Sequence, residues 1–439
     1  IMGIPKDSGY VFFIPAGVRT TLAYPTPIQT AKEFHDCLKS EQFKNLAEKY
    51  GEAELFKLIK KDAEENSSPI KTVLENLQNK DVKAKDVEYN FVSGVYKDGN
   101  PWNGINAKVN IANSNKKWNF VTMESPKNTK RVTAFVEEFN KFGAKAKIAW
   151  NGGYILNPEL VGKLGLPESY IGSPLGLMIS NKIVKSTPLF NKPALLIYED
   201  GRLDIKRVNV ANGISISCKT RIIDFPSENY NLDDTRTNLP DFCYYDLMYD
   251  KEIIEGNGRT IVRLAGNVIK EVIFSKRGEK VNVVPTGLTL SIAEQAFPAI
   301  WDSVDKELDI CINGLEGIEH AVEAGPLLVN NNKFCLDMET EGWKTNNSII
   351  TQAARLDYTD MRGPKIAVGI DKKGNLIVLT INGRIRESVG ATHIDMAEIL
   401  LKFGIEKAMG FDPGGSSTLV VGDKTLNISP YNSQYERNI

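Results

Sequence analysis

Short β-branched and aromatic runs, separated by Gly, Asn and Asp, fill the chain from about residue 86 onward, and this texture limits the fold most. Four clear runs cover residues 87–95, 107–111, 118–123 and 194–198. Runs of this length and composition are typical of strands, and the turn residues between them leave little room for long helices. We therefore expect an α+β fold, with a mixed β-sheet domain and flanking helices over residues 86–439.

Residues 1–85 have a different composition, rich in Lys, Glu, Leu and Ala. Phe34, Leu38, Phe43, Leu46 and Ala47 recur at helical spacing, which predicts amphipathic helices. We expect a small helical N-terminal extension to the larger domain.

Two units within residues 86–439 share one plan, a helix followed by a glycine and a strand. The first combines a predicted helix over 129–142 with Gly143 and a strand over 146–150. The second combines a helix over 394–403 with Gly404 and a strand over 407–411. Each strand ends in a polar, glycine-rich loop, so the two loops are candidates for a functional site.

Charge and histidine content exclude several classes of function. The chain carries 54 Lys and Arg against 55 Asp and Glu, for a net charge of −1, so it has no global field for a nucleic-acid backbone. Its 3 histidines lie far apart, which argues against a zinc site built on His. No apolar run reaches the ~20 residues of a transmembrane helix. We expect no nucleic-acid partner and no transmembrane segment, and the sequence names no cofactor or metal.

The first loop, Asn151-Gly152-Gly153, has two interpretations. Asn-Gly is a strong signal for a tight turn without any function. Alternatively, two glycines bring the backbone close to a ligand and expose N–H donors, with the Asn151 amide as a further contact.

The second loop begins at Asp412, and Asp-Pro-Gly is also ordinary turn chemistry. After the carboxylate, however, come two glycines and three hydroxyls, more polar residues than a hairpin requires: Gly414, Gly415, Ser416, Ser417 and Thr418. Such a loop offers an acid/base group together with donors for a phosphate or a sugar. Glu323, beside Gly325, is a candidate second carboxylate, or simply a solvated charge next to a turn.

These segments together resemble the phosphodiester glycosidase family in order and rough spacing. The resemblance covers about residues 87–421 and is densest over 324–421. It rests on Asn151-Gly152-Gly153, residues 176–181 and 325–329, residues 367–374, Asn382-Gly383-Arg384, Ser388, Thr392, Asp412 and residues 414–418.

The resemblance implies an enzyme, a glycoside hydrolase that cleaves a sugar-1-phosphodiester or a phosphate-linked glycosidic bond. It implies Asp412, Asn151 and Glu323 as catalytic candidates. It also implies a set of substrate-binding candidates: Gly152, Gly153, Gly325, Lys365, Arg384, Ser388, Thr392, Gly414, Gly415, Ser416, Ser417 and Thr418. The habits of the family imply an extracytoplasmic location, whether secreted, periplasmic or surface-anchored.

Two positions depart from the family pattern. Pro413 stands where the family commonly has a glycine, and it removes one N–H donor. Lys365 stands where an arginine is favoured, and lysine keeps the charge without the bidentate geometry; Arg362 is a possible substitute. Two other functions remain open, a non-catalytic protein that binds anionic glycans and a phosphodiesterase that cuts the P–O bond.

Overall fold

The structure is a computed structural model. It describes residues 10–13, 21–24, 38–52, 54–55, 57–59, 87–111, 118–123, 129–143, 145–343, 361–385 and 387–428. Much of the expected helical extension over 1–85 therefore lies outside the described residues. Within it, α2 (Glu41–Tyr50) confirms one amphipathic helix, which Ser40 caps by accepting a hydrogen bond from the Phe43 N–H. The strands β1 (Tyr10–Phe13) and β2 (Thr21–Tyr24) form a hairpin, so this region is not helical throughout.

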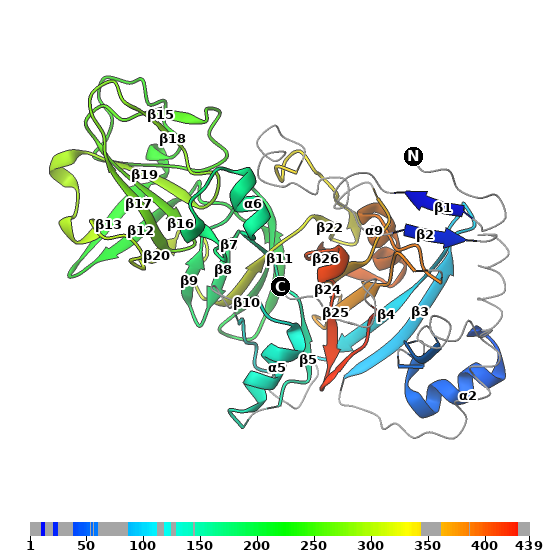
Figure 1. The fold of residues 1–439 in the computed structure, drawn as a ribbon. Coiled ribbons are helices and arrows are strands. Elements are labelled where there is room, and N and C mark those ends of the chain that lie inside the picture. Colours follow the sequence, from blue (N-terminus) through cyan, green and yellow to red (C-terminus); the bar gives the residue numbers. More distant parts are fainter. Residues whose placement is uncertain are drawn as a thin grey trace.

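A seven-stranded sheet joins the first two strands of the large domain to five strands from its C-terminal part (Figure 1). In spatial order its strands are β23 (Lys333–Phe334), β22 (Leu327–Asn330), β26 (Ile405–Gly410), β24 (Lys365–Asp371), β25 (Leu376–Ile381), β4 (Pro101–Val109) and β3 (Glu88–Val95). The helix α9 (His393–Lys402) packs on one face of this sheet.

The central strands of this sheet are buried on both faces, and their side chains alternate between two cores. In β24, Ile366 and Val368 join one core while Ala367 packs with α9 on the other side. In β25, Val378 and Leu379 divide in the same way. Such double burial explains why these strands read as continuous apolar runs rather than as alternating ones.

The remaining strands form smaller sheets (Figure 1). A five-stranded sheet contains β11 (Leu203–Arg207), β10 (Pro193–Tyr198), β21 (Ile318–Glu323), β8 (Met178–Ser180) and β9 (Ile183–Ser186). A lobe beyond it contains β12 (Gly213–Cys218), β13 (Arg221–Pro226), β14 (Phe242–Tyr245), β15 (Ile253–Glu255), β16 (Thr260–Ala265), β17 (Val268–Phe274), β18 (Lys280–Asn282), β19 (Leu288–Ile292) and β20 (Asp309–Ile312). Short pieces are α5 (Val132–Asn140), α6 (Pro158–Lys163), β5 (Ile148–Trp150), β6 (Tyr154–Ile155), β7 (Pro174–Leu175), β27 (Leu419–Val421) and β28 (Lys424–Thr425).

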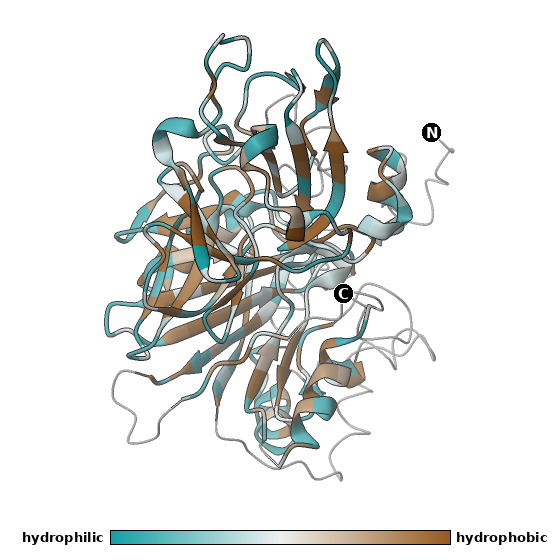
Figure 2. Ribbon diagram, turned by 90° about the vertical axis from the view of Figure 1, so that its left-hand side faces the viewer, coloured by the Kyte–Doolittle hydropathy of each residue, from teal (hydrophilic) through white to brown (hydrophobic). Residues whose placement is uncertain are grey.

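The expected α+β class is confirmed in its coarse form, with few helices and much sheet. Every ladder between the described strands is antiparallel, so the sheets do not have the mixed direction that we expected. Short connections between neighbouring strands favour antiparallel pairing, because a parallel crossover needs a dozen or more residues. Figure 2 shows apolar residues gathered along the strands and polar residues along the loops that join them.

Both helix–glycine–strand units are confirmed. The helix α5 is followed by Gly143 and leads into β5, and α9 is followed by Gly404 and leads into β26. Gly143 has φ 86° and Gly404 has φ 69°, a left-handed conformation that ends a helix at little cost only for glycine.

The strand expected over residues 118–123 is wrong. Exposure alternates along these residues, as it would in a strand, but no strand among the described residues pairs with them. Side chains make the contacts instead: Thr122 Oγ1 donates to the Ile179 carbonyl, and Ser180 Oγ donates to the Thr122 carbonyl, each at 3.3 Å. The alternation thus reports an extended segment rather than a sheet strand.

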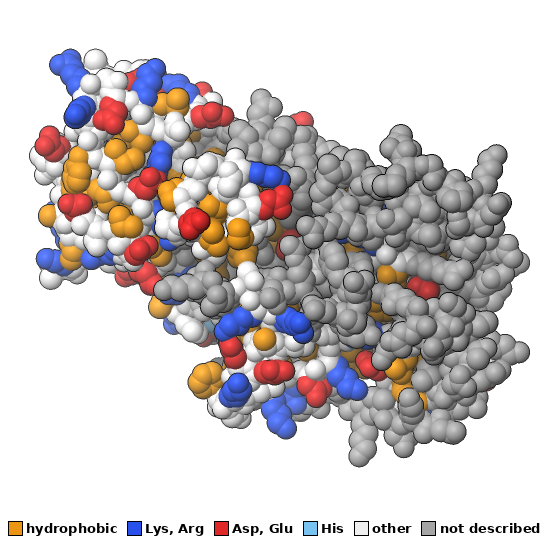
Figure 3. Space-filling model, viewed as in Figure 1, with side chains coloured by type: hydrophobic (Ala, Val, Ile, Leu, Met, Phe, Trp, Pro, Cys, Tyr) orange, Lys and Arg blue, Asp and Glu red, His pale blue; other side chains and the backbone are white. Residues whose placement is uncertain are grey.

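Acidic and basic side chains lie interspersed on the described surface that Figure 3 shows, in keeping with the balanced composition. Among the described helices, none is long and apolar enough to cross a membrane.

Candidate functional site

The loop that follows β26 lies where four other segments of the chain meet. Phe411 N–H donates to the Ile366 carbonyl at 3.0 Å, and Gly414 N–H donates to the Pro364 carbonyl at 2.9 Å. Gly410 exchanges backbone hydrogen bonds with Gly325 and Pro326, each at 2.9 Å. Residues that are far apart in sequence thus fix the course of the 412–418 loop.

Asn151 joins the first glycine loop to the second. Its Nδ2 donates to the Asp412 carbonyl, and its Oδ1 accepts from the Thr418 N–H, each at 2.9 Å. Asn151 is 1% exposed, so its amide holds both ends of the 412–418 loop at once. The pairing of β5 with β27 places the two loops together. If each loop were only a tight turn, this proximity would not be required.

A second asparagine, which we did not predict, holds the same loop from the other side. Asn427 Nδ2 donates to the Ser417 carbonyl at 2.6 Å, and Asn427 Oδ1 accepts from the Leu419 N–H at 2.7 Å. Its neighbour Ile428 donates its N–H to Asn382 Oδ1 at 2.7 Å. Asn427 belongs to none of the motifs identified in the sequence, so only the folded chain reveals this role.

The glycines of the first loop stand close to Glu323. A Cβ on Gly153 would lie 2.3 Å from the Glu323 carbonyl oxygen, whereas one on Gly152 would meet only Val322 Cγ1, at 3.7 Å. Asp412 N–H donates to the Gly152 carbonyl at 3.4 Å. The three predicted catalytic residues, Asp412, Asn151 and Glu323, therefore belong to adjoining segments.

Arg384 lies beside the second loop. Its guanidinium Nη1 is 3.9 Å from where a Cβ on Gly414 would stand, and the residue is 7% exposed. Its backbone has φ 58°, a left-handed conformation that costs a non-glycine residue about 1–3 kcal/mol.

Other predicted binding residues have structural partners. Ser388 Oγ donates to the Asn382 carbonyl at 2.5 Å, and Thr392 caps α9 by accepting from the Asp395 N–H at 3.0 Å. Lys365 Nζ donates to the Met361 carbonyl at 3.4 Å. Arg362 binds the carboxylates of Asp98 and Asp395, so it holds α9 to the 98 loop rather than replacing an arginine at position 365.

The three hydroxyls of the second loop differ in their contacts. Thr418 Oγ1 donates to the Ser416 carbonyl at 3.0 Å. Ser417 is 4% exposed, and its Oγ has no hydrogen-bond partner among the described residues. Because a buried hydroxyl without a partner is costly, Ser417 is the hydroxyl best suited to receive a bound molecule or a water.

Glu323 is buried rather than solvated. Its carboxylate is 2% exposed and accepts from the Leu177 N–H at 2.8 Å and the Leu189 N–H at 3.2 Å. Burial raises the pKa of Glu323 to about 8, against the backbone hydrogen bonds and the charge of Lys192. Burial also lowers the pKa of Lys192 to about 8 and raises that of Glu341 to about 7. Lys192, with its Nζ 4.4 Å from the Phe190 ring centre and 4.6 Å from that of Trp343, is a second residue that we missed.

This buried carboxyl predicts a specific pH dependence of stability. The folded pKa of about 8 lies above the ordinary 4.5, so folded Glu323 retains a proton that the unfolded chain loses. The free energy of unfolding should therefore fall as pH rises from about 4.5 to about 8, by on the order of a few kcal/mol. In Glu323→Gln this part of the fall should vanish in urea titrations at several pH values. Glu319→Gln, on the same strand, should keep the wild-type slope, and an unchanged slope in Glu323→Gln would contradict the assignment.

Comparison with known proteins confirms the resemblance found in the motifs. Residues 251–439 match the phosphodiester glycosidase family. N-acetylglucosamine-1-phosphodiester alpha-N-acetylglucosaminidase from Bos taurus is 29% identical over 107 residues, which are 24% of this chain and 18% of that protein. The SPbeta prophage-derived uncharacterized protein YomE of Bacillus subtilis is 32% identical over 87 residues, 19% of this chain and 14% of that protein.

These matches are partial. They span less than a fifth of the length of either curated relative. A hypothetical protein from Synechocystis has a solved structure with a TM-score of 0.48 and 16% identity, over 78% of this chain and 59% of that one. The family match contains Asp412 and its loop but begins after Asn151.

Proposed function

We propose that this chain, whose residues 251–439 match the phosphodiester glycosidase family, hydrolyses the bond between the anomeric carbon of a sugar and the oxygen of a phosphodiester. One observation carries the proposal: the Asn151 loop and the Asp412 loop are joined by the two hydrogen bonds of the Asn151 amide, beside Arg384. A carboxylate, a cation and glycine-lined backbone in one place are what this reaction requires.

The chemistry follows from the substrate. A phosphodiester oxygen is a weak base and leaves readily, so binding its charge matters more than protonating it. The guanidinium of Arg384 and the backbone N–H of Gly415 would hold the phosphate. Asp412 would stabilise positive charge at the anomeric carbon and accept a proton from the attacking water. The C–O bond breaks, the water oxygen joins the sugar, and the phosphate leaves as a monoester.

The remaining candidates have supporting parts in this proposal. Ser417 would hydrogen-bond the sugar or a phosphate oxygen, since its buried hydroxyl has no partner among the described residues. Asn151 would position the loop rather than touch the substrate. Glu323, protonated near neutral pH, would donate a hydrogen bond or a proton. The family resemblance also supports an extracytoplasmic location.

A panel of substrates tests the function. Purified protein should release free sugar and nucleoside diphosphate in equal amounts from nucleotide-activated N-acetylglucosamine. From simple sugar 1-phosphodiesters it should release free sugar and a phosphate monoester in equal amounts. Alkyl glycosides of the same sugars should react far more slowly, because an alkoxide leaving group is a stronger base than a phosphate. Tight binding of every phosphodiester without product would favour the glycan-binding function instead.

A further inference from the structure

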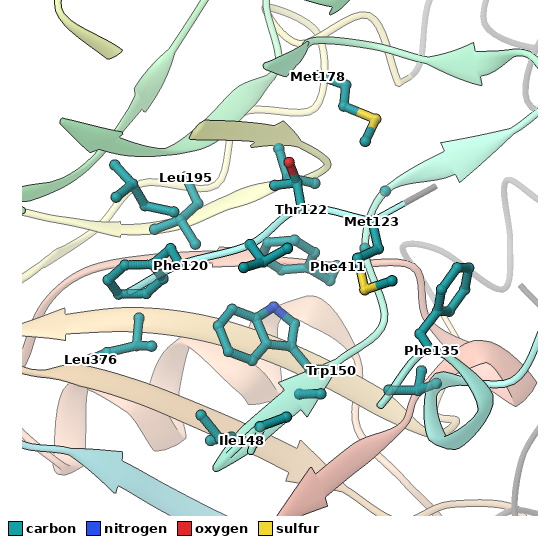
Figure 4. A pocket seen from close by; sticks show the side chains of 18 of the residues that line it. Phe120, Thr122, Met123, Phe135, Ile148, Trp150, Met178, Leu195, Leu376 and Phe411 are labelled. Atoms are coloured by element: carbon teal, nitrogen blue, oxygen red, sulfur yellow. The ribbon is translucent and has the colours of Figure 1, made fainter. Parts of the chain in front are cut away.

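A large apolar cavity opens beside the candidate site, and the proposed function does not use it. Its volume is about 790 Å³, within the range of pockets that hold small organic ligands. The irregular segment 118–123, α5, β5, β8, β10 and Phe411, which follows β26, all contribute to its wall. Figure 4 shows side chains from these elements turned toward one another, among them Phe120, Phe135, Trp150, Leu195 and Phe411.

We infer that this cavity binds the apolar chain of an amphiphilic sugar phosphodiester, such as an alkyl, acyl or isoprenoid group attached to the phosphate. The inference rests on the proposed function, which it deepens by naming the class of the group on the far side of the phosphate. Three features of the cavity carry it: its wall, its contact with the first glycine loop and the charge at its rim.

The wall is apolar and open to a ligand. Phe120, Phe135, Trp150 and Met178 are only half-buried, although each faces the cavity. Val121 and Met123, also in its wall, are 51% and 40% exposed. Exposed apolar side chains at the wall of a concave site are an unfavourable arrangement in water unless a ligand covers them.

The cavity adjoins the first glycine loop. Trp150 immediately precedes Asn151, and Phe411 immediately precedes Asp412, so the strands that carry the site also build the cavity wall. Gly152, Gly153 and Glu323 line the cavity as well. Among the described residues that line the cavity, these three belong to the candidate site, so a substituent of the phosphate would enter the apolar space beside Gly152 and Gly153.

The charge at the rim fits an anionic head group. Lys145 and Lys147 line the cavity and are exposed. Lys108 also lines it, but it pairs with Asp371 at 3.3 Å. In the described part of the cavity wall, the acidic side chains are Glu88 and Glu323, and burial raises the pKa of Glu323 to about 8. This balance favours a molecule with an apolar chain and a phosphate over a neutral hydrocarbon.

Chain length is the variable that tests the inference. Each buried methylene raises affinity about fourfold, so burial of three or four gives about a hundredfold. The methyl and decyl esters of N-acetylglucosamine 1-phosphate would be compared below the micelle concentration. We expect kcat/KM to be at least about a hundredfold higher for the decyl ester.

Phe135→Glu should reduce this decyl-to-methyl ratio of kcat/KM to below about ten, with kcat/KM for the methyl ester unchanged. Phe142→Glu, at the end of the same helix but outside the cavity wall and 86% exposed, should leave the ratio unchanged.

A binding measurement separates this inference from the proposed function. Quenching of the fluorescence of Trp118 and Trp150 reports binding of both esters without turnover. Chain-length-dependent binding without hydrolysis would contradict the proposed function and support the cavity. Equal kcat/KM values or equal dissociation constants for the two esters would overturn the role of the cavity. An equal change of the decyl-to-methyl ratio in the two Phe variants would overturn it as well. Should Phe135→Glu fail to fold, Met123→Glu at an exposed position makes the same comparison.

Discussion

Replacing Asp412 with Asn is expected to lower kcat/KM for a sugar phosphodiester by about a thousandfold. The change removes the negative charge that would stabilise the anomeric centre and accept a proton, and it keeps the shape of the side chain. Stability should change little, because the loop is held through the backbone of Asp412, by Gly152 and Asn151. Steady-state kinetics with a thermal melt of each variant would measure both.

Asp309→Asn is the matched control for this variant. Asp309 is exposed on β20, in the lobe beyond the five-stranded sheet, and the same substitution there should leave turnover and stability at wild-type values. Retention of more than about a tenth of the activity in Asp412→Asn would remove this carboxylate from the mechanism.

Replacing Gly153 with Ala is expected to destabilise the protein by about 2–4 kcal/mol, in the range of severe overpacking. The new Cβ would lie 2.3 Å from the backbone carbonyl oxygen of Glu323, which no side-chain rotation can relieve. One of the two segments must move, so activity should fall together with stability. Urea unfolding and kcat/KM are the measurements.

The neighbouring glycine provides the control. Gly152→Ala places its Cβ 3.7 Å from Val322 Cγ1, an ordinary contact, so its free energy of unfolding should stay within about 1 kcal/mol of wild type. Equal effects at the two positions would show that the approach of Gly153 to Glu323 is not the reason for the glycine.

The sequence predicts much of the architecture because burial patterns and helix ends are local signals. The periodic apolar faces of α5 and α9 and the glycines after them mark both units, and the order of the motifs indicates the family. Segment 118–123 shows the limit of such signals. Its alternation is the same whether or not a neighbouring strand is present, and only the tertiary fold decides that.

The chemistry of single side chains is harder to predict. Glu323 next to a turn reads as a solvated charge, yet the fold surrounds it with Leu177, Leu189 and Lys192 from other segments. Asn427 and Lys192 belong to no motif, and their roles arise from contacts across long sequence separations. Segments between residues 88 and 411 that are far apart in sequence likewise build the cavity, so no local pattern predicts it.

Hydrolysis in water labelled with oxygen-18 tests the central claim most directly. Wild-type protein and Asp412→Asn would be incubated in parallel with a sugar 1-phosphodiester, and the oxygen-18 content of both products would be measured by mass spectrometry. Cleavage at the anomeric carbon predicts the label in the free sugar with wild-type protein, and little product with the variant. Label in the phosphate product would contradict the proposal and identify a phosphodiesterase that cuts the P–O bond.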